Sequence, residues 1–455
     1  MQPLRTLGVC MKILFISLGC DKNLVDSEEM LGLLTKSGNK IVDTEEEAEG
    51  IIINTCCFIH DAKEESVETI LEMAEYKKAG TCKALIVTGC MAQRYKEEII
   101  KEIPEVDAVL GTASYGEIVK ALNEASQGRH FQEYKDINYL PLPDGGRILT
   151  TGGHFGYLKI AEGCDKHCTY CIIPKLRGRF RSVPMERLLS QAGEMAEQGV
   201  KELILVAQET TVYGTDLYGK KSLHLLIKEL CKIPGIRWIR ILYCYPEEIY
   251  EDLITVMKEE KKVCHYLDLP IQHASDRILK RMGRRTTKKE LKDIIARLRK
   301  EIPDIVLRTT LISGFPGETQ EDHEELMDFV DEMEFDRLGV FTYSAEEDTP
   351  AAAMEGQIPQ ECKEERRDEL MELQQEISLE KGEARIGQEL LVMIEGKVSG
   401  ENAYIGRTYG DAPKVDGYIF VQTGEVLMTG DFARVRVTGA LEYDLIGELA
   451  DEYTE

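Results

Sequence analysis

The sequence predicts an α/β protein in three parts: an N-terminal open parallel α/β sheet, a central partial (β/α)6 barrel and a small C-terminal β-barrel of OB-like type. Three observations predict this fold class. Short apolar runs alternate with helical stretches over the first part of the chain, and the alternation resumes at wider spacing further on. Near the C-terminus, short strands alternate instead with Gly-containing turns. The 455 residues provide enough chain for two or three hydrophobic cores.

The first domain is expected over residues 11–130. The runs KILFIS, GIIINT and KALIVTG are each followed by polar, helix-forming sequence, which predicts parallel strands joined by helices. Residues 1–10 precede Met11, where the first strand begins, and we expect them to be a spurious or dispensable extension. Residues 132–150 contain turn-forming residues and little helical periodicity, so they are expected to form a linker.

The second domain is expected over residues 150–382, where helical stretches separate six strand-like runs. Six β/α repeats fall short of the eight that close a full barrel, so an open, partial barrel is predicted. A charged helix over residues 359–382 would end this domain as a connector. The six runs are YLKIAEG, ELILVAQ, WIRILY, CHYLDLP, IVLRTTLISGF and RLGVFTYS.

The third domain is expected over residues 385–455. Its short strand-like runs and Gly-containing turns are typical of a small five-stranded barrel. The region contains six Lys or Arg and thirteen Asp or Glu, so this barrel is acidic. The runs are ELLVMIEGKV, AYIGRTY, GYIFV and ARVRVTGAL.

The composition favours a cytoplasmic protein without membrane segments. Hydrophobic residues make up 43% of the chain and charged residues 30%, no apolar run approaches the roughly 18 residues of a membrane span, and the N-terminus lacks the apolar segment of a signal peptide. The net charge of −26 repels phosphate backbones and suits a basic partner, although solubility alone also explains it. Thirteen cysteines without an export signal favour metal binding or chemistry over a disulfide framework.

Three cysteines lie within a stretch of eight residues, directly after the run YLKIAEG. Cys164, Cys168 and Cys171 follow a Cys-x3-Cys-x2-Cys pattern, and three thiolates on one loop can hold one metal centre. They are one ligand short of a closed structural zinc site or a fully protein-ligated cluster, which leaves one metal position open for a substrate or cofactor. The alternatives are a zinc site that recruits His167, or plain structural cysteines.

A second set of three cysteines follows the predicted strands of the first domain. Cys20, Cys56 and Cys90 each come directly after one strand. Because the C-terminal ends of neighbouring parallel strands converge on one crevice, these thiolates can form a second three-ligand site. Cys20 also precedes a predicted helix, whose N-terminal partial charge favours a thiolate. The alternative is three unconnected buried cysteines. The cysteines expected to be packing or incidental residues are Cys57, Cys82, Cys231, Cys244, Cys264 and Cys362.

The loop motif, with an aromatic residue before its last cysteine, resembles the signature of radical S-adenosylmethionine (SAM) enzymes. The resemblance implies a [4Fe–4S] cluster whose open iron chelates the amino and carboxylate groups of SAM, which is then cleaved to a radical that abstracts a substrate hydrogen. It also implies SAM contacts, and the alternative for each is an ordinary loop or packing role. These are Tyr170 near the adenine, Gln208 and Glu209 after the second strand, and Gln272 and Arg308 at the ends of later strands.

Taken together, the motifs resemble those of the methylthiotransferase family over essentially the whole chain. The resemblance implies that the last domain is a TRAM domain, a substrate-recognition barrel, and that a second [4Fe–4S] cluster at Cys20, Cys56 and Cys90 carries an extra sulfur. One SAM would methylate that sulfur and a second would activate the substrate carbon, with an electron donor such as flavodoxin. Cys57 departs from the pattern, because a smaller residue is expected there. The matching stretches are GCDKNLVDSE, INTCCFI, TGCMAQRY, EGCDKHCTYCIIPKLRGRFRS and YIGRTYGDAPKVDGYIFV.

Two features indicate the substrate. The block SLGCDKNLVDSE resembles the RimO type, which modifies an aspartate of small-subunit ribosomal protein S twelve, whereas the transfer-RNA enzymes have a Tyr-Gly-Cys-Gln-x-Asn-type block. An acidic recognition barrel suits a basic ribosomal protein, whereas an RNA-docking barrel would be basic. We therefore expect methylthio transfer to the β-carbon of that aspartate, in free or ribosome-bound protein, and no direct transfer-RNA substrate. The alternatives are a transfer-RNA adenosine methylthiotransferase and, in another class, a non-enzymatic iron–sulfur scaffold or RNA-binding module.

Overall fold

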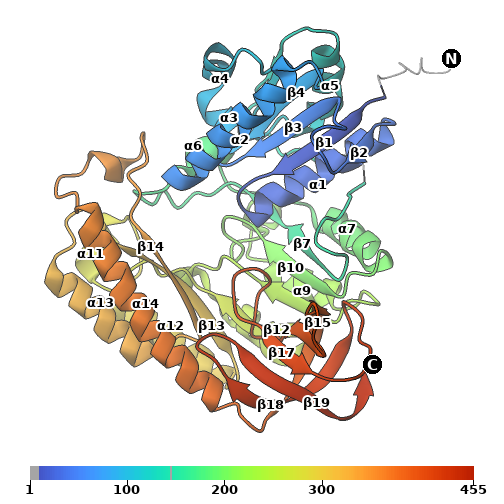
Figure 1. Ribbon diagram of the computed structural model, residues 1–455. Coiled ribbons are helices and arrows are strands. Elements are labelled where there is room, and N and C mark those ends of the chain that lie inside the picture. The colour runs from blue at the N-terminus through green and yellow to red at the C-terminus, as the bar shows by residue number, and fades with distance from the viewer. Residues whose placement is uncertain (1–9, 144–145, 455) are drawn as a thin grey trace. The chain divides into compact units, whose positions relative to one another are not determined.

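The computed structural model describes residues 10–143 and 146–454, and the chain divides into two compact units (Figure 1). The first unit combines the chain up to Thr150 with two later segments, Ala161–Val183 and Ser344–Ala352. The second unit combines Thr151–Ile160, Pro184–Tyr343 and Ala353–Glu455. The predicted N-terminal extension lies outside the described residues, apart from Cys10. No helix among residues 10–143 and 146–454 is long and apolar enough to cross a membrane.

The first unit contains a six-stranded, fully parallel sheet in the order β2-β1-β3-β4-β5-β6. The predicted open parallel sheet is therefore confirmed. Its three central strands coincide with the three predicted runs, and the outer strands are three residues long. The last of these outer strands, β6, includes the first residues of the predicted linker. The strands are β1 (Lys12–Ser17), β2 (Lys40–Val42), β3 (Gly50–Thr55), β4 (Ala84–Gly89), β5 (Ala108–Leu110) and β6 (Phe131–Glu133).

The strands β3 and β4 are buried along their whole length because both faces of the sheet are covered. Every residue of β3 and of β4 is buried. Alternate side chains enter different cores: Ile51 and Ile53 pack on one face, whereas Ile52 packs on the other. The covering helices are α1 (Asp21–Lys36), α2 (His60–Lys78), α3 (Cys90–Tyr95), α4 (Glu97–Glu102) and α5 (Ile118–Ser126).

The predicted linker is held against α1 by the carboxylate of Glu28, which is fully buried. Glu28 Oε2 accepts a hydrogen bond of 2.7 Å from Arg147 Nε, and Oε1 accepts one of 2.7 Å from the backbone N–H of Thr150. Gly32 of α1 permits this approach, since a Cβ there would lie 2.3 Å from the carbonyl oxygen of Gly146. Residues 146–150 therefore follow a fixed path along α1 without regular secondary structure.

The segment Ala161–Val183 packs on the N-terminal sheet, although it follows a strand of the central barrel in sequence. It contains β8 (Ala161–Glu162), α6 (Ile173–Arg177) and β9 (Arg181–Ser182). Ile172 and Leu176 belong to the hydrophobic cluster formed beneath β3 and β4, and Figure 1 shows α6 beside α3. Thr112 Oγ1 donates a hydrogen bond of 2.7 Å to the carbonyl of Leu176. The first unit thus includes the loop that contains Cys164, Cys168 and Cys171.

The second unit contains six parallel strands in the order β14-β13-β12-β11-β10-β7, which confirms the predicted partial barrel. Each strand overlaps one predicted run. The strands are β7 (Phe155–Lys159), β10 (Glu202–Val206), β11 (Trp238–Ile241), β12 (Val263–Asp268), β13 (Val306–Ser313) and β14 (Arg337–Thr342). The helices between them are α7 (Met185–Glu197), α8 (Thr215–Tyr218), α9 (Leu223–Leu230), α10 (Glu251–Glu259), α11 (Asp276–Arg281), α12 (Lys288–Glu301) and α13 (Gln320–Met333).

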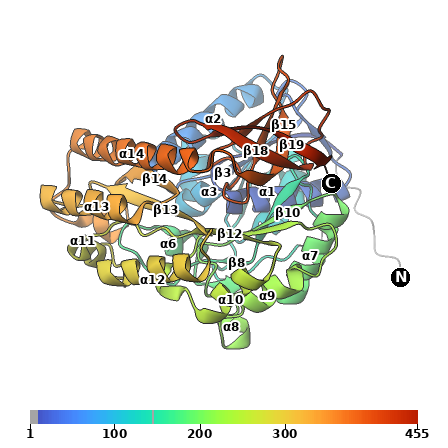
Figure 2. The ribbon, with the colours of Figure 1, turned by 90° about the horizontal axis from the view of Figure 1, so that it is seen from below.

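The predicted charged connector is the long helix α14 (Gln360–Glu383). It packs along β13, β14 and α13, as Figure 2 shows, so it is also the last covering helix of the barrel. The C-terminal region forms a closed barrel in the order β15-β16-β17-β19-β18, which confirms the predicted five strands. They are β15 (Glu389–Lys397), β16 (Ala403–Arg407), β17 (Ile419–Gln422), β18 (Phe432–Ala440) and β19 (Leu445–Thr454).

A buried ion network joins this closed barrel to the central sheet within the second unit. Glu202, fully buried at the start of β10, accepts hydrogen bonds of 2.7 Å from Arg240 Nε and from Arg407 Nη2. Arg407 also donates to Glu395 Oε1 at 2.6 Å. Burial alone would raise the pKa of Glu202, but the two guanidinium groups outweigh it and lower that pKa. The network therefore keeps three charged side chains ionised inside the protein.

Two aspartates that follow β16 extend this junction across the next strands. Asp416 accepts a hydrogen bond of 2.7 Å from Tyr266 Oη on β12 and pairs with Arg308 Nε on β13 at 3.3 Å. Asp411 pairs with Arg337 at the start of β14 at 2.5 Å. The segment 407–416 thus contacts side chains from β10 to β14, and it fixes the C-terminal barrel on the sheet.

Candidate functional site

The cysteines predicted from strand ends lie where the predicted topology places them. Cys20 follows β1 and is the N-cap residue of α1, Cys56 follows β3, and Cys90 follows β4 as the first residue of α3. Cys20 is exposed, whereas Cys56 and Cys90 are buried. Ser66 on α2 fixes the backbone of Cys56, since its hydroxyl accepts from the Cys56 N–H at 3.1 Å and donates to the Cys56 carbonyl at 2.9 Å.

The loops that present Cys20 and Cys56 approach so closely that only glycine fits between them. Gly19 has φ = +83°, and a Cβ at this position would lie 2.6 Å from Cys56 Cβ and 2.9 Å from Cys56 Sγ. Gly89, which precedes Cys90, has φ = +93°, and a Cβ there would lie 2.4 Å from Asn54 Oδ1. Glycines before two of the three cysteines therefore let the strand ends converge.

Electrostatic effects also indicate that the three thiols are neighbours. Burial, followed by the negative charges that Cys90 and Cys20 would carry, raises the pKa of Cys56 to about 12. Burial also raises the pKa of Cys90, against the opposing charge of Arg177. Buried thiols of this kind stay protonated at neutral pH unless a metal displaces the proton. Three soft sulfur donors at one sheet edge fit an iron–sulfur cluster.

In the apoprotein at about pH 8, iodoacetamide is expected to alkylate Cys20 and to leave Cys56 largely unmodified, because the thiolate is the nucleophile. Cys20 is exposed, whereas Cys56 is buried and its pKa is raised to about 12. At pH values below that pKa, the alkylation rate of Cys56 should rise about tenfold for each unit by which the pH is increased. Peptide mapping by mass spectrometry measures both rates. Equal rates at the two cysteines would contradict the buried environment assigned to Cys56.

Cys57, the residue that departs from the family pattern, belongs to a hydrophobic cluster that also contains Cys90. It is fully buried in the hydrophobic cluster beneath the sheet, beside Ile53 and Met91. Burial raises its pKa as well. The packing role expected for Cys57 agrees with its burial, and the choice of Cys56 as the ligand stays a prediction.

The second set of cysteines occupies the loop between β8 and α6. The backbone N–H of Cys171 donates to the carbonyl of Cys168 at 3.0 Å, which closes a tight turn around the last two cysteines. Gly163, with φ = +82°, precedes Cys164, and a Cβ there would lie 2.1 Å from the carbonyl oxygen of Arg179. Burial, followed by the charges of Cys168 and Cys164, raises the pKa of Cys171. The loop therefore gathers three sulfur donors, as its spacing predicts.

Within residues 10–143 and 146–454, no group of three or more His, Cys, Asp or Glu side chains is arranged to hold a metal ion. His167, the alternative fourth ligand, is exposed and has φ = +54°. The three cysteines of a cluster bind different iron atoms, so they need to surround a volume and not to converge on one point. The donor sets are therefore compatible with a cluster in their chemistry.

The predicted SAM contacts are distributed over both units. Tyr170 lies in the cysteine loop of the first unit. Gln208 and Glu209 follow β10 in the second unit, and Glu209 is buried. Gln272 follows β12 with φ = +72°, and its backbone N–H donates to the carbonyl of Thr310 at 2.9 Å. Their contacts with SAM stay predictions.

The expectation that Arg308 lies at the end of its strand is wrong. Arg308 is the third of the eight residues of β13, and its guanidinium donates to Asp268 at 2.8 Å and pairs with Asp416 at 3.3 Å. Burial opposes its positive charge, but the two carboxylates raise its pKa above the ordinary value. The position of Arg308 therefore favours a structural role at the junction with the C-terminal barrel over a contact with SAM.

Arg177 is a residue of the site that the cysteine spacing did not indicate. It ends α6, it is 2% exposed, and it reaches from the cysteine loop to the end of the N-terminal sheet. Its Nη2 donates to Cys90 Sγ at 3.4 Å and to Asn23 Oδ1 at 3.0 Å. No sequence signal identifies Arg177, because its burial and its contact with Cys90 are visible only in the folded chain.

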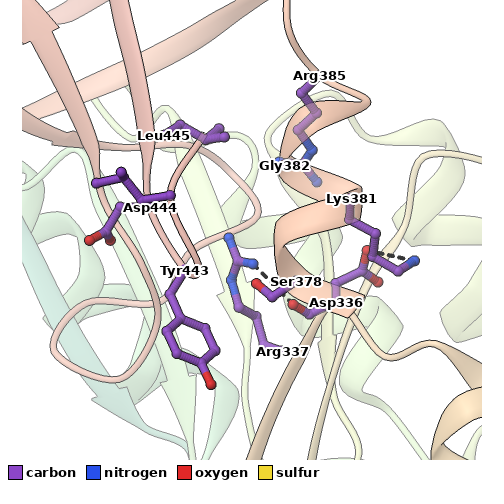
Figure 3. Close-up of a pocket in the computed structure, with 10 residues that line it drawn as sticks. Asp336, Arg337, Ser378, Lys381, Gly382, Arg385, Tyr443, Asp444 and Leu445 are labelled. Carbon is purple, nitrogen blue, oxygen red and sulfur yellow. Dashed lines mark hydrogen bonds and ion pairs between the residues drawn. The ribbon is translucent and has the colours of Figure 1, made fainter. Parts of the chain in front are cut away.

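The pocket shown in Figure 3 lies in the second unit, between β14, α14 and the C-terminal barrel, whereas both cysteine sets belong to the first unit. Lys381 Nζ pairs with Asp336 Oδ1 at 3.4 Å, and Arg337 Nη1 donates to the carbonyl of Asp336 at 3.0 Å. The predicted site residues do not line it. This pocket therefore belongs to the junction that fixes the barrel.

Three family models match successive parts of the chain. The uncharacterized protein family UPF0004 matches residues 12–111, the radical SAM superfamily matches residues 158–330, and the TRAM domain matches residues 386–450. Among solved structures, the radical SAM methyltransferase TsrM from Kitasatospora setae covers 75% of this chain and 74% of its own, with a TM-score of 0.52 at 12% identity. The cobalamin-dependent SAM radical enzyme OxsB covers 81% of this chain and 56% of its own, with a TM-score of 0.51 at 16% identity. These two likenesses concern the fold alone.

Curated relatives match almost the full chain. A protein of Lachnoclostridium phytofermentans is 64% identical over 96% of this chain and 99% of its own length. A protein of Clostridioides difficile is 50% identical over 97% of this chain and 99% of its own length. Both are named ribosomal protein uS12 methylthiotransferase RimO.

Proposed function

Because the chain belongs to the RimO family of ribosomal protein uS12 methylthiotransferases, we propose that it transfers a methylthio group to the β-carbon of an aspartate in that ribosomal protein. The observation that carries the proposal is the 64% identity to a protein of this name over 96% of the chain. The chain is a radical SAM enzyme and a transferase. Its site of action would be the cytoplasm, where ribosomes are assembled and used.

Radical SAM enzymes use a [4Fe–4S] cluster and SAM. Cys164, Cys168 and Cys171 would hold that cluster, and Cys20, Cys56 and Cys90 would hold a second one. When bound, the loop cluster would supply the electron that cleaves SAM, and the second cluster would carry the sulfur to be transferred. Two SAM molecules per turnover and an external reductant such as flavodoxin complete this proposal.

The residues around the cysteines would prepare the site in three ways. Gly19, Gly89 and Gly163 allow the loops to approach, so the sulfur atoms are preorganised before a cluster binds. Burial of Cys56 and Cys90 keeps water away from one side of the second site. Tyr170, Gln208, Glu209 and Gln272 would hold SAM. An unactivated C–H bond offers no acidic proton to a general base, which is why a dry, ordered site for radical chemistry is needed.

The acidity of the C-terminal barrel supports a protein substrate. The region from Arg385 contains six basic and thirteen acidic residues, and this sign of charge attracts a basic ribosomal protein and repels RNA phosphates. No observation favours the transfer-RNA adenosine alternative.

Mass spectrometry of ribosomal proteins from cells with and without the gene tests the proposed function. A methylthio adduct on uS12 is expected only in cells that carry an intact gene. Cells that carry the Cys168→Ala variant should lack the adduct, which controls for indirect effects of the deletion. Digested transfer RNA from the same cells should be unchanged. An adduct that appears on adenosine alone would assign the chain to the other substrate class.

A further inference from the structure

One arginine connects the two proposed cluster sites. Arg177 follows Cys171 by six residues, yet its side chain lies at the end of the N-terminal sheet, inside the first unit. Nη2 donates to Cys90 Sγ at 3.4 Å, and Nη1 donates to Asp26 Oδ2 at 2.7 Å. The loop of one site therefore provides a cation to a cysteine of the other.

The orientation of this guanidinium is fixed by several acceptors at once. Nη1 also donates to Glu162 Oε2 at 3.1 Å, and Nη2 also donates to Asn23 Oδ1 at 3.0 Å. Asp26 and Glu162 are 3% and 4% exposed, so these charge-assisted hydrogen bonds are shielded from water. The planar fork of arginine can satisfy such a set, whereas the ammonium group of lysine cannot reproduce its geometry. Rotation of Arg177 away from Cys90 would therefore break its charge-assisted hydrogen bonds to two buried carboxylates.

A hydrogen bond and a positive charge at a ligand sulfur have a defined effect on an iron–sulfur cluster. Both stabilise the more negative, reduced state, because net charge and hydrogen bonds to the sulfurs set the reduction potential. We propose that Arg177 is a positioning residue for the N-terminal cluster, which orients the Cys90 ligand and raises the reduction potential of that cluster. This inference rests on the proposed second cluster, but it does not depend on which substrate is modified.

The test uses a full-length parent in which Cys164, Cys168 and Cys171 are replaced by alanine, so that only the N-terminal cluster remains. After anaerobic reconstitution, a redox titration followed by electron paramagnetic resonance gives the midpoint potential. Arg177→Met is expected to lower that potential and to change the spectrum of the reduced cluster. Arg177→Lys keeps the charge and should lower the potential less. An unchanged potential and spectrum in Arg177→Met, with iron retained, would overturn the proposal.

Arg94→Met provides the matched control. Arg94 lies on α3, the helix that Cys90 begins, and its side chain is 6% exposed and pairs with Glu346 at 3.1 Å. Its Nη1 donates to the carbonyl of Cys57 at 3.4 Å and not to a proposed ligand sulfur. This variant should leave the midpoint potential unchanged. An equal shift in Arg94→Met would show a general loss of buried charge and would contradict a specific role for Arg177.

The outcomes in which iron is lost are also decisive. Loss of iron from Arg177→Met with retention in Arg177→Lys supports the role, since the charge then suffices to hold the ligand set. Loss of iron and of native circular dichroism in both variants would make Arg177 purely structural and would overturn the proposal. A parent that binds no iron would refute the second cluster and this inference together. Absence of a methylthio adduct on uS12, with the potential shift intact, would refute only the proposed substrate.

Discussion

Replacing Cys164, Cys168 and Cys171 together by alanine is expected to abolish methylthio transfer and to halve the iron content, from about eight atoms per chain to about four. The loop would then have no thiolate to hold its cluster, so reductive cleavage of SAM should stop as well. Iron analysis and detection of 5′-deoxyadenosine under reducing conditions measure the two losses separately.

The corresponding change in the N-terminal set should separate the two proposed roles. The variant in which Cys20, Cys56 and Cys90 are alanine should also hold about four irons. It should still cleave SAM, because the loop cluster remains, but it should not transfer a methylthio group. A control with alanine at Cys82, Cys231 and Cys362, which show no ligand spacing, should keep about eight irons. About four irons in the unmodified chain would contradict the two-cluster proposal.

Arg407→Met is expected to destabilise the second unit by about 3–5 kcal/mol, because it removes one partner from a buried ion network. Arg407 and Glu202 are both fully buried, and the variant would leave Glu202 with Arg240 alone and Glu395 without its arginine. Denaturant unfolding followed by circular dichroism measures the change. The variant should retain its iron, since the network lies in the unit that does not contain the cysteine sets.

The control and the pH dependence make this prediction specific. Arg436 pairs with Glu389 at 3.0 Å on the same barrel, but their side chains are 48% and 42% exposed, so Arg436→Met should cost less than about 1 kcal/mol. The pKa of Glu202 is lowered from 4.5, so its ionised form stabilises the fold above that pH. The difference between the unmodified chain and Arg407→Met should therefore narrow as the pH falls below 4.5. Equal destabilisation by the two arginine variants would contradict the role of burial.

The central strands of both sheets could be predicted because strands buried on both faces contain runs of consecutive apolar residues. GIIINT becomes β3, and each of its six residues is buried. The strands β2, β5 and β6 could not be predicted, since three residues give no periodicity. Five strands are predicted for the C-terminal barrel, but the fifth, β19, could not be located, because LIGELADEYT includes acidic residues that interrupt its apolar pattern.

The candidate site shows the same division between local and long-range information. The spacing of Cys164, Cys168 and Cys171 is local, and strand ends locate Cys20, Cys56 and Cys90 once a parallel sheet is predicted. The contact between Arg177 and Asp26 joins residues 151 positions apart, and no spacing rule reports it. The error about Arg308 has another cause: the predicted run IVLRTTLISGF already places it near the beginning of the strand, and only its pairing with Asp416 required the folded chain.

The position of the segment Ala161–Val183 in the first unit determines how this chain can be recombined with others. A chimera joined within the linker at residues 132–150 would separate Ile172 and Leu176 from the hydrophobic cluster in which they pack. In such a chimera, Arg177 would also face another protein's residues at the positions of its present partners, Asp26 and Asn23. The N-terminal sheet and the cysteine loop must therefore be exchanged together, and they are expected to have been inherited as one piece despite the barrel strand that lies between them in sequence.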